Sequence, residues 1–315
     1  MKNILITGAS GYLGSLLLEK LASKKEILGI NHLVAADIKI HPRLPQNALF
    51  EYLDVREKKA TDLFKKYQID CVIHLASIVT PSNQSNREFE YSVDVEGTKN
   101  ILQACVESNV KRIIISSSGA AYGYYPENIK PLVETDPIRG NFEFAYSYHK
   151  KLIEEELKKY RELYPSLEQT IFRITTILGK NVNNQITDLF KKKIQLGICG
   201  TESGFSFIWD QDATQCFEQS IFSEKYGIYN LAGDGYVSLK ERGQILKKPI
   251  IQIPSKIIEL ALCILKFFKL TQYGPEQTMF LKYRPILNNQ KLKKEFGFTP
   301  TKTSREVFEY YSTLI

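Results

Sequence analysis

The chain has 315 residues, enough for one α/β domain with a smaller lobe, and its 43% hydrophobic and 24% charged residues are ordinary for a soluble globular protein. The net charge of +7 comes from lysines spread along the chain. No lysine cluster is long enough for a nucleic-acid-binding arm, so we expect no nucleic-acid partner, whereas a ligand that carries phosphate would gain from the positive field.

The first half of the chain alternates short apolar runs with amphipathic segments. The apolar runs predict strands at Ile4–Thr7, Leu33–Ala36, Cys71–Leu75, Arg112–Ser116 and Thr170–Ile174. The amphipathic segments predict helices at Leu13–Leu21, Lys58–Tyr67, Phe89–Val106 and Tyr146–Leu163. Apolar strands that alternate with helices are typical of a parallel sheet covered on both faces, and right-handed crossovers then give an α/β fold with a doubly wound Rossmann sheet.

A glycine-rich turn joins the first predicted strand to the first predicted helix, with the sequence Thr7-Gly-Ala-Ser-Gly-Tyr-Leu-Gly14. Gly8 allows the tight turn, Gly11 lets the backbone approach a pyrophosphate, and Gly14 lets the helix pack closely on the sheet. The first helical residues present free N–H groups and a partial positive charge to phosphates. We therefore predict a dinucleotide site made by Gly8, Ser10, Gly11, Tyr12, Leu13 and Gly14.

Acidic residues follow two of the strands in this half. Asp37 ends the second strand, where a carboxylate accepts both hydroxyls of the adenosine ribose and repels a 2′-phosphate. NAD is therefore favoured over NADP, although Lys39 close by softens the preference. Asp54 follows a short strand, in a position from which a carboxylate could accept from the adenine amino group.

A serine triplet and a tyrosine–lysine pair provide the candidate catalytic groups. Ser116-Ser-Ser118 ends a strand at the carboxyl edge of the sheet, and Tyr146 and Lys150 lie four residues apart at the start of a helix, so they face the same way. The lysine ammonium and a positive nicotinamide ring favour the phenolate of a tyrosine whose pKa is ordinarily about 10. We predict that Tyr146 takes a proton from a substrate hydroxyl, that Ser118 hydrogen-bonds the same oxygen, and that Lys150 also holds the nicotinamide ribose. His149 is expected to point to another face and is given no role.

The pattern loosens after about Ile177. A helix is predicted over Ile186–Leu196, a strand over Phe205–Trp209, and a strand over Tyr226–Leu231 that returns to the main sheet. We assign residues 1–178, with about 205–235, to an NAD-binding Rossmann domain. Residues from about 179–204 and 236–315 are assigned to a smaller C-terminal substrate-binding lobe.

The stretch Ile250–Leu270 is unusually apolar. It is interrupted by Pro254, Lys256, Glu259 and Lys266. These interruptions leave it short of the roughly 20 apolar residues that a membrane span needs. We predict a buried or groove-lining helix over Ser255–Phe268, with contact to a membrane surface as the alternative.

The five cysteines are odd in number, widely spaced and without a CxxC pair. We therefore expect neither a disulfide framework nor a metal site, and a reducing, cytoplasmic location. The N-terminus runs directly into a strand at Asn3 without the regions of a signal peptide, which fits the same location.

Together these motifs resemble those of the extended short-chain dehydrogenase/reductases, in particular the NAD-dependent epimerase/dehydratase family that includes UDP-glucose 4-epimerase. The resemblance covers nearly the full chain and rests on TGASGYLG at 7–14, Asp37, LDVR at 53–56, HLAS at 74–77, VEGT at 95–98, SSSGAAYG at 116–123, YSYHK at 146–150, FRITTILG at 172–179 and NLAGDGYVSLKE at 230–241. It implies a triad of Ser118, Tyr146 and Lys150. It also implies NAD as cofactor, with Asp54, Val55, Leu75, Ala76 and Ser77 among its contacts. Family members commonly form homodimers, here through the helices around 89–108 and 146–163.

Three departures from the family pattern narrow the activity. Dehydratases place an acidic pair directly after the serine, where this chain has Gly119 and Ala120, so dehydration is not expected. Thr176 stands where the family has an asparagine that helps to bind a nucleotide sugar, and Asp94 replaces the asparagine of the NVxGT motif. Arg284 could pair with a diphosphate, because its planar fork suits phosphate oxygens, or it could be a structural arginine under the C-terminal helix.

Two classes of function stay open. In the leading class, an enzyme oxidises a secondary alcohol to a ketone with NAD and returns the hydride to the opposite face, as a nucleotide-sugar 4-epimerase does. A net NAD-dependent dehydrogenase or reductase of a hydrophobic, sterol- or lipid-like alcohol is the alternative, favoured by the apolar segment 250–270. The second class is a non-catalytic module that senses the redox state of NAD, which would not need Ser118, Tyr146 and Lys150.

Overall fold

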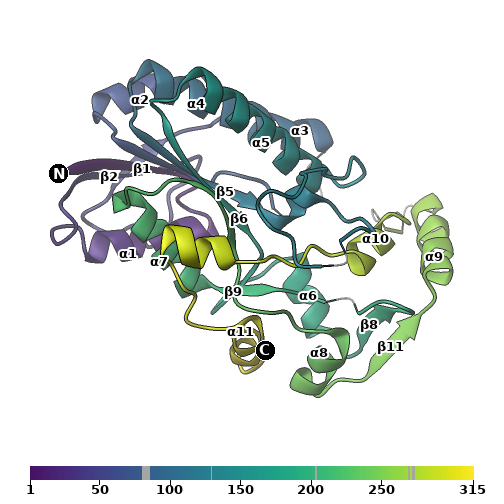
Figure 1. Ribbon diagram of the computed structural model, residues 1–315. Coiled ribbons are helices and arrows are strands. Elements are labelled where there is room, and N and C mark those ends of the chain that lie inside the picture. The colour runs from purple at the N-terminus through teal and green to yellow at the C-terminus, as the bar shows by residue number, and fades with distance from the viewer. Residues whose placement is uncertain (80–85, 129, 203, 269, 272–273) are drawn as a thin grey trace.

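A parallel sheet forms the centre of the molecule (Figure 1). The computed structural model describes residues 1–315 except 80–85, 129, 203, 269 and 272–273. Within these residues the sheet has seven strands in the order β10-β6-β5-β4-β1-β2-β3. Their bounds are β1 (Lys2–Thr7), β2 (Ile30–Asp37), β3 (Leu49–Tyr52), β4 (Cys71–His74), β5 (Arg112–Ser118), β6 (Glu168–Ile174) and β10 (Gly227–Leu231). The strand order reverses between β1 and β4, which creates the crevice where ligands of doubly wound sheets bind. The predicted α/β fold is confirmed.

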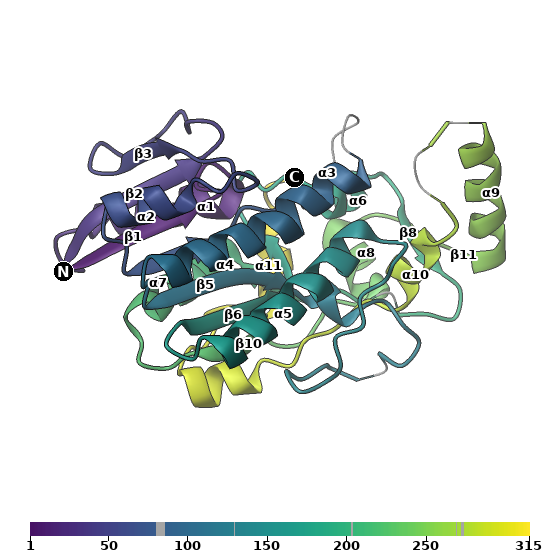
Figure 2. The same ribbon diagram turned by 90° about the horizontal axis from the view of Figure 1, so that it is seen from above.

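Helices cover both faces of this sheet (Figures 1 and 2). One face carries α1 (Tyr12–Ser23) and α7 (Asp210–Phe222), and the other carries α2 (Ala60–Lys66), α4 (Gly97–Glu107) and α5 (Ala145–Leu163). The period-two alternation of strand side chains explains this arrangement. In β1, Ile4 and Ile6 pack into the α1/α7 side of the core, and Leu5 packs into the opposite side.

The predicted helix Phe89–Val106 is formed by three consecutive helical segments, the middle one of which is π-helical. They are α3 (Arg87–Tyr91), the π-helical segment η1 (Ser92–Glu96) and α4. The side chain of Asn86 caps α3 by accepting from the N–H of Phe89 at 2.8 Å. Asp94 lies in the π-helical segment, and π-helical turns are frequent at functional sites.

Two small parallel sheets and several helices build the second half of the chain. The sheets pair β7 (Thr176–Leu178) with β9 (Phe207–Trp209), and β8 (Gln195–Ile198) with β11 (Ile250–Ile253). The helical elements are η2 (Gly119–Tyr122) in the first half, and α6 (Gln185–Lys191), α8 (Leu239–Leu246), α9 (Ser255–Phe267), α10 (Gln277–Lys282), η3 (Leu292–Phe296) and α11 (Ser304–Ser312). A separate aromatic core holds this part together, with Phe190, Phe205, Phe207 and Phe308 among its members.

The predicted strand Tyr226–Leu231 is confirmed as part of the main sheet, because β10 pairs with β6 from Gly227↔Thr170 to Leu231↔Ile174. Leu292, Phe296 and Phe298 pack into the main core beside it. The C-terminal segment therefore supports the main sheet as well as the smaller lobe. The division into residues 1–178 with 205–235, and 179–204 with 236–315, stays a proposal.

Two predicted element boundaries are wrong. The helix predicted over Ile186–Leu196 ends at Lys191, because Gln195 begins β8 and pairs with Ile250. The strand predicted from Phe205 starts only at Phe207, and Phe205 instead makes an isolated antiparallel bridge with Val237. In both places a tertiary partner far along the chain decides the local structure.

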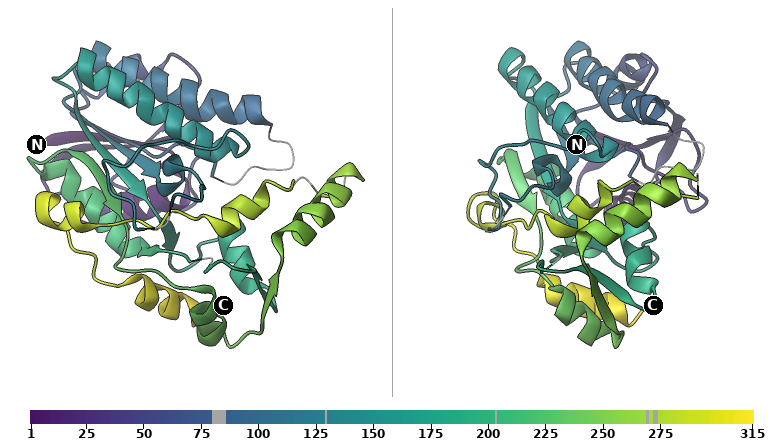
Figure 3. Two further views of the ribbon diagram at one scale, coloured as in Figure 1. Left: turned by 45° about the vertical axis from the view of Figure 1, so that its right-hand side comes forward. Right: turned by 90° about the vertical axis from the view of Figure 1, so that its right-hand side faces the viewer.

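The apolar helix predicted over Ser255–Phe268 exists as α9, but the prediction that it is buried is wrong, while groove lining and contact to a membrane surface stay predictions. No residue of α9 is buried, and Phe267 is 82% exposed. The helix projects from the body of the protein beyond α10 (Figures 1 and 3). Among the described residues, no helix has the length and apolar character needed to cross a bilayer.

Candidate active site

The glycine turn has the geometry of a phosphate cradle. Gly8 has a positive φ of 65°, and a Cβ there would lie 2.6 Å from the backbone nitrogen of Ala76. A Cβ at Gly14 would overlap the carbonyl oxygen of Gly8. Helix α1 therefore packs against the turn more closely than a residue with a side chain at position 14 would allow. The N-cap of α1 is Gly11, which has no side chain to cap the helix, and the first turn contains no acidic residue. The N–H groups of this turn are therefore available to an anion.

Asp37 is held against this turn. One carboxylate oxygen accepts from the backbone N–H of Ser10 at 2.9 Å, and the other accepts from the N–H of Lys39 at 3.3 Å. The hydroxyl of Ser10 donates to the carbonyl of Lys39 at 2.6 Å. These bonds place a carboxylate at the end of β2 beside the turn, where the adenosine ribose of a dinucleotide binds in such folds.

The segment after β4 forms the other wall of the turn. The N–H of Leu75 donates to the carbonyl of Thr7 at 3.1 Å, and Thr7 Oγ1 is 2.7 Å from His74 Nδ1. The other ring nitrogen of His74 lies 3.0 Å from Thr98 Oγ1. Burial, with a smaller effect of Lys150, lowers the pKa of His74 to about 3, so this imidazole is neutral and joins β1, β4 and α4.

Asp54 is engaged by a neighbour. The guanidinium of Arg56 donates to both carboxylate oxygens, at 3.0 Å from Nε and 2.5 Å from Nη2, and these bonds hold the pKa of Asp54 below its ordinary range. Val55 is buried, and its carbonyl accepts from Asn100 at 3.0 Å. The predicted contacts of Asp54 and Val55 with a cofactor stay predictions.

Ser118, Tyr146 and Lys150 come together where β5 ends and α5 begins. Lys150 Nζ donates to the carbonyl of Ser116 at 3.0 Å and lies 5.4 Å from the centre of the Tyr146 ring. The Ser118 hydroxyl interacts with the Tyr146 phenol through a hydrogen bond and accepts from the N–H of Ala120 at 3.1 Å. Ser147 fixes the start of α5, because its hydroxyl donates to the carbonyl of Ala120 at 2.7 Å.

Burial dominates the ionisation of this group. It raises the pKa of the Tyr146 phenol, while the hydrogen bond with Ser118 acts in the opposite direction and Asp94 adds to the rise. It lowers the pKa of the Lys150 ammonium, against the attraction of Asp94 and Glu154. The pKa of Tyr146 is therefore raised in the protein without cofactor, because burial and the nearby Asp94 outweigh the hydrogen bond with Ser118.

Asp94 and His149 form a buried pair behind these residues, and each is 1% exposed. His149 Nδ1 lies 3.1 Å from one oxygen of Asp94. The other oxygen accepts from the hydroxyl of Ser77 and the N–H of Ile78, each at 2.9 Å. The predicted cofactor contact Ser77 is thus tied to α5 through a carboxylate and an imidazole.

Two arginines of the smaller lobe stack on one phenylalanine. The guanidinium carbons of Arg284 and Arg242 lie 3.7 Å and 4.5 Å from the centre of the Phe205 ring. Arg284 also lies 3.9 Å from the ring centre of Phe280 in α10. Burial lowers the pKa of Arg284 to about 10, and burial together with Arg284 lowers that of Arg242 to about 9.

Neither arginine has an ion-pair partner among the described residues. Arg242 is only 3% exposed, and its Nε has no hydrogen-bond partner; the same holds for Nε and Nη2 of Arg284. Buried charges in proteins are usually paired, as Arg173 is here with Glu154 at 2.7 Å. Two close and unpaired guanidinium groups therefore indicate a site that an anion completes.

Aromatic side chains connect this arginine pair with the catalytic group. Tyr124 packs on Phe144 and Phe280, with ring centres 5.5 Å and 5.1 Å apart. Tyr124 is close enough to both Tyr146 and Arg284 for its charge to affect their pKa values. Tyr146, Tyr124 and Arg284 thus follow one another along one wall of the site.

Thr176 and Tyr12 lie between the two parts of the molecule. Thr176 belongs to β7 and is the register partner of Phe207, and its predicted contact with substrate stays a prediction. The hydroxyl of Tyr12 donates to Asp210 at 2.7 Å and to the carbonyl of Lys180 at 3.1 Å. The predicted cofactor residue Tyr12 thereby links the glycine turn to α7 and the β7 segment.

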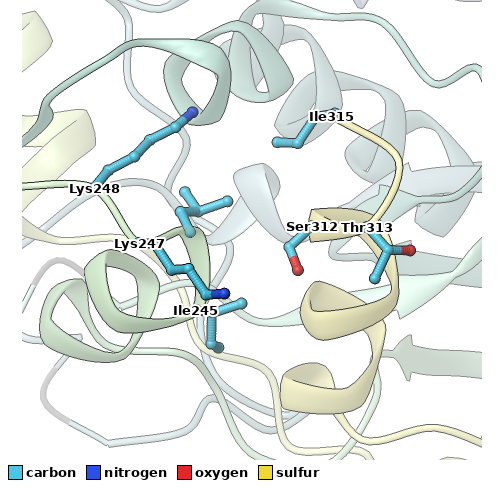
Figure 4. Close-up of a pocket in the computed structure, with 7 residues that line it drawn as sticks. Ile245, Lys247, Lys248, Ser312, Thr313 and Ile315 are labelled. Carbon is cyan, nitrogen blue, oxygen red and sulfur yellow. The ribbon is translucent and has the colours of Figure 1, made fainter.

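A separate surface pocket lies between the end of α8 and the C-terminus (Figure 4). It has a volume of about 290 Å³ and is lined by Ile245, Leu246, Lys247, Lys248, Ser312, Thr313 and Ile315. None of these residues belongs to the glycine turn, the catalytic group or the arginine pair. We assign this pocket no role in the chemistry.

The residues at the glycine turn fit a dinucleotide. The turn leaves no space for side chains at positions 8 and 14, exposes uncapped N–H groups and has a carboxylate beside it. The triad stands at the carboxyl edge of β5, two strands away from the turn. Such an arrangement defines an enzyme of the extended short-chain dehydrogenase/reductase type.

The family is shown by comparison with known proteins. The model of the NAD-dependent epimerase/dehydratase family matches residues 4–204, and the chain belongs to that family. Its cofactor is accordingly NAD. An uncharacterised protein of Mycobacterium tuberculosis is 22% identical over 316 residues, covering 98% of this chain and 83% of that protein.

Two further similarities bear on fold and substrate. The crystal structure of the UDP-glucose 4-epimerase of Thermus thermophilus in complex with NAD superposes with a TM-score of 0.75 at 19% identity, covering 99% of this chain and 98% of that one. The N-acetyl-α-D-glucosaminyl-diphospho-ditrans,octacis-undecaprenol 4-epimerase of Escherichia coli O157:H7 is 30% identical over 191 residues. That alignment covers 60% of this chain and 53% of the relative.

Sequence reasoning missed Arg242, Phe205 and the Asp94–His149 pair as parts of the site. His149 was predicted to point away from Tyr146 and was given no role, and its partner lies 55 residues earlier in the chain. Arg242 sits in the amphipathic helix α8, where an arginine ordinarily faces solvent. Only the replacement of the NVxGT asparagine by Asp94 gave a signal, because a buried carboxylate needs a partner.

Proposed function

We propose that this enzyme catalyses an NAD-dependent 4-epimerase-like reaction on a sugar that carries a diphosphate. The observation that carries the proposal is the unpaired, stacked pair Arg242 and Arg284 in the wall that leads to Tyr146. Arginine forks pair with phosphate oxygens through two parallel hydrogen bonds. A neutral alcohol would leave both buried guanidinium groups unpaired, at a high cost in free energy.

The catalytic group supplies the proton transfers. Tyr146 accepts the proton of the sugar hydroxyl, Ser118 hydrogen-bonds the same oxygen, and Lys150 is held by the carbonyl of Ser116 so that its ammonium stays beside the phenol. NAD, when bound, supplies the hydride acceptor at the carbon. Phosphate anchoring at Arg242 and Arg284 leaves the sugar free to present either face to the same tyrosine.

The test is a comparison of substrates with defined variants. Purified protein is incubated with UDP-glucose, UDP-N-acetylglucosamine and a polyprenyl-diphosphate-linked N-acetylglucosamine, and the 4-epimers are measured by NMR. We expect epimerisation of at least one without net NADH absorbance. Tyr146→Phe is expected to lower kcat by about 10²–10⁴-fold while NAD still binds.

The arginine pair is tested by Arg284→Met, which keeps the stacked aliphatic volume. Removal of a fully desolvated charge partner of the diphosphate is expected to raise KM by at least about tenfold and to leave kcat nearly unchanged. Arg305→Met, at an exposed ion pair in α11, is the matched control. An unchanged KM in Arg284→Met would contradict the proposed anion site.

One observation favours the second candidate, a net dehydrogenase or reductase of a hydrophobic alcohol. Tyr124, Phe144 and Phe280 form an aromatic wall beside Tyr146 that an apolar substrate could contact. Stoichiometric NADH formation from a sterol-like alcohol, with no turnover of diphospho-sugars, would establish this candidate instead. Undiminished activity in Tyr146→Phe, with NAD binding retained, would show that Tyr146 is not the catalytic residue.

A further inference from the structure

The outward side of α9 carries an apolar stripe. Its members follow one another at helical spacing of three or four residues along one face. They are Ile257 (59% exposed), Leu260 (63%), Ile264 (49%), Phe267 (82%) and, just after the helix, Phe268 (63%). The opposite side of α9 faces α10. There, Glu259 of α9 accepts from the hydroxyl of Thr278 of α10 at 3.0 Å and lies 3.6 Å from Nζ of Lys282, also in α10. One side of α9 is therefore anchored and the other has no partner in the described part of the chain.

Exposure of this kind is uncommon on a monomeric surface. Scattered apolar side chains are normal, but contiguous large ones mark a surface that contacts another phase or partner. The sheet that leads into α9 adds to it, because the register partners Leu196 of β8 and Ile251 of β11 are 41% and 45% exposed. The figures show α9 projecting from the body, so the stripe is accessible (Figure 3).

The charge around the stripe is positive. α9 carries Lys256 and Lys266 against one glutamate, Glu259, and the neighbouring α10 adds Lys282. The single glutamate, Glu259, is already paired with Lys282, and the next acidic residue, Glu276, lies 4.0 Å from Lys266. The surface that flanks the apolar stripe therefore presents lysines without free carboxylates among the described residues.

We propose that α9 lies in the surface of a bilayer that contains anionic phospholipid, with its apolar stripe among the acyl chains and its lysines at the headgroups. A short helix with large aromatic and aliphatic residues on one face and lysines beside them is the form that interfacial helices take. A second copy of the chain, which would cover the same stripe in the absence of lipid, is the competing outcome of the test below.

The placement of α9 has a consequence for the site. Phe280 of α10, which packs on α9, stacks on Arg284 at 3.9 Å. The bilayer surface would therefore lie next to the arginine pair, and a substrate with an anionic group and a lipid chain could enter from it. The membrane contact itself does not depend on the proposed reaction, and it is tested without any substrate.

The test is flotation of the full chain with vesicles. Phosphatidylcholine vesicles with about one-third phosphatidylglycerol are compared with pure phosphatidylcholine, at low and high salt. We expect binding to the anionic vesicles, weakened by salt. Leu260→Gln with Phe267→Gln is expected to lower the partition coefficient at least tenfold, and Lys256→Gln with Lys266→Gln is expected to remove most of the preference for anionic lipid.

The control replaces exposed apolar residues elsewhere, Ile27 (88% exposed) and Tyr226 (52%), by glutamine. Its vesicle binding should equal that of the wild type, and all variants should keep the wild-type melting temperature because the changed side chains are exposed. Absence of binding to anionic vesicles, or equal binding by Leu260→Gln with Phe267→Gln, overturns the proposal. So does a dimer that this variant converts to monomer in the absence of lipid, which would identify a second copy as the occupant.

Discussion

Asp94 shows how one residue can connect the cofactor side and the catalytic side of the site. Its two oxygens accept from Ser77 and Ile78 and lie next to His149, and both members of the pair are buried. The Asp94–His149 pair places a polar link between the strand that faces the glycine turn and the helix that carries Tyr146. His149, inside the YSYHK motif, therefore has a structural role as the partner of a carboxylate.

Gly11 and Gly14 of the first turn have different neighbours, so an alanine at each position should have a different effect. Gly14→Ala is expected to destabilise the protein itself, by about 1–3 kcal/mol, because the new Cβ would overlap the carbonyl of Gly8. Gly11→Ala should leave the free energy of unfolding almost unchanged, because Gly11 has an ordinary φ of −74° and a Cβ there meets only the Gly8 oxygen at 3.2 Å. It should still weaken NAD binding, because the methyl group occupies the space of the pyrophosphate.

Urea unfolding and NAD titration of the two variants measure both effects. A Gly11→Ala protein that binds NAD as tightly as the wild type would contradict the predicted approach of the pyrophosphate. A Gly14→Ala protein of wild-type stability would contradict the packing.

At the scale of elements, the first half of the chain could be predicted because its signals are local. β1, β2, β4, β5 and β6 contain buried apolar runs, and the glycine turn and the YxxxK spacing indicate where α1 and α5 begin. In the second half, β8 and α6 depend on the distant strand β11, and no local pattern indicates where one ends and the other begins. Burial of α9 was predicted wrongly for the same reason: composition shows that a helix is apolar, but not whether any element covers it.

Capping boxes begin three helices of the second half, α6, α8 and α11, and that of α8 provides a test. Ser238 caps the helix by accepting from the N–H of Glu241 at 3.3 Å, and Glu241 accepts from the Ser238 N–H at 2.9 Å. Ser238→Ala is expected to cost about 1 kcal/mol of stability at neutral pH.

The cost should depend on pH with a defined sign. The backbone N–H of Ser238, and its hydroxyl at 2.8 Å, donate to Glu241 and hold the pKa of this carboxyl below its ordinary range; Ser238→Ala removes only the hydroxyl bond. The contribution of this carboxylate is therefore fully present above the unfolded-state pKa of about 4.3 and is lost as the pH falls through the lower folded-state value. Urea unfolding at neutral pH and at about pH 3.5 measures the difference in unfolding free energy between wild type and Ser238→Ala. We expect this difference to be smaller in acid, and an equal or larger difference in acid would contradict the proposed role of the carboxylate.

At the scale of the whole molecule, cofactor binding should stabilise the fold. NAD at about 100 times its Kd adds about 2.7 kcal/mol, which corresponds to a rise of several degrees in Tm. NADP at the same concentration should give a smaller rise, because Asp37 repels a 2′-phosphate. Asp37→Asn keeps an oxygen that accepts from the N–H of Ser10, and it should reduce the difference between the Tm rises that NAD and NADP give. Differential scanning fluorimetry measures all four combinations, and a larger shift with NADP in the wild type would refute the assignment of Asp37.

The homodimer through the helices around 89–108 and 146–163 stays a prediction, which light scattering in solution tests directly. The predicted cytoplasmic location likewise stays a prediction.

The sequence could predict the cofactor and catalytic residues of the site, because Gly8, Asp37, Ser118, Tyr146 and Lys150 are recognisable by their spacing. Arg284 is a predicted substrate residue, but its pairing with Arg242 on Phe205 could not be predicted, because these residues come from separate segments that only the tertiary fold brings together.

The outermost strand on one side of the central sheet is β10, which begins 53 positions after the end of its neighbour β6. During synthesis on a ribosome, at roughly 5–20 residues per second, β6 would therefore wait about 3–10 seconds for its neighbour. Throughout that interval the hydrogen-bonding edge of β6, with Ile171 and Phe172 beside it, is open to pairing with any other nascent strand. A chain that stops short of residue 227 should consequently be held by chaperones or aggregate, although every motif of the dinucleotide site has already been made.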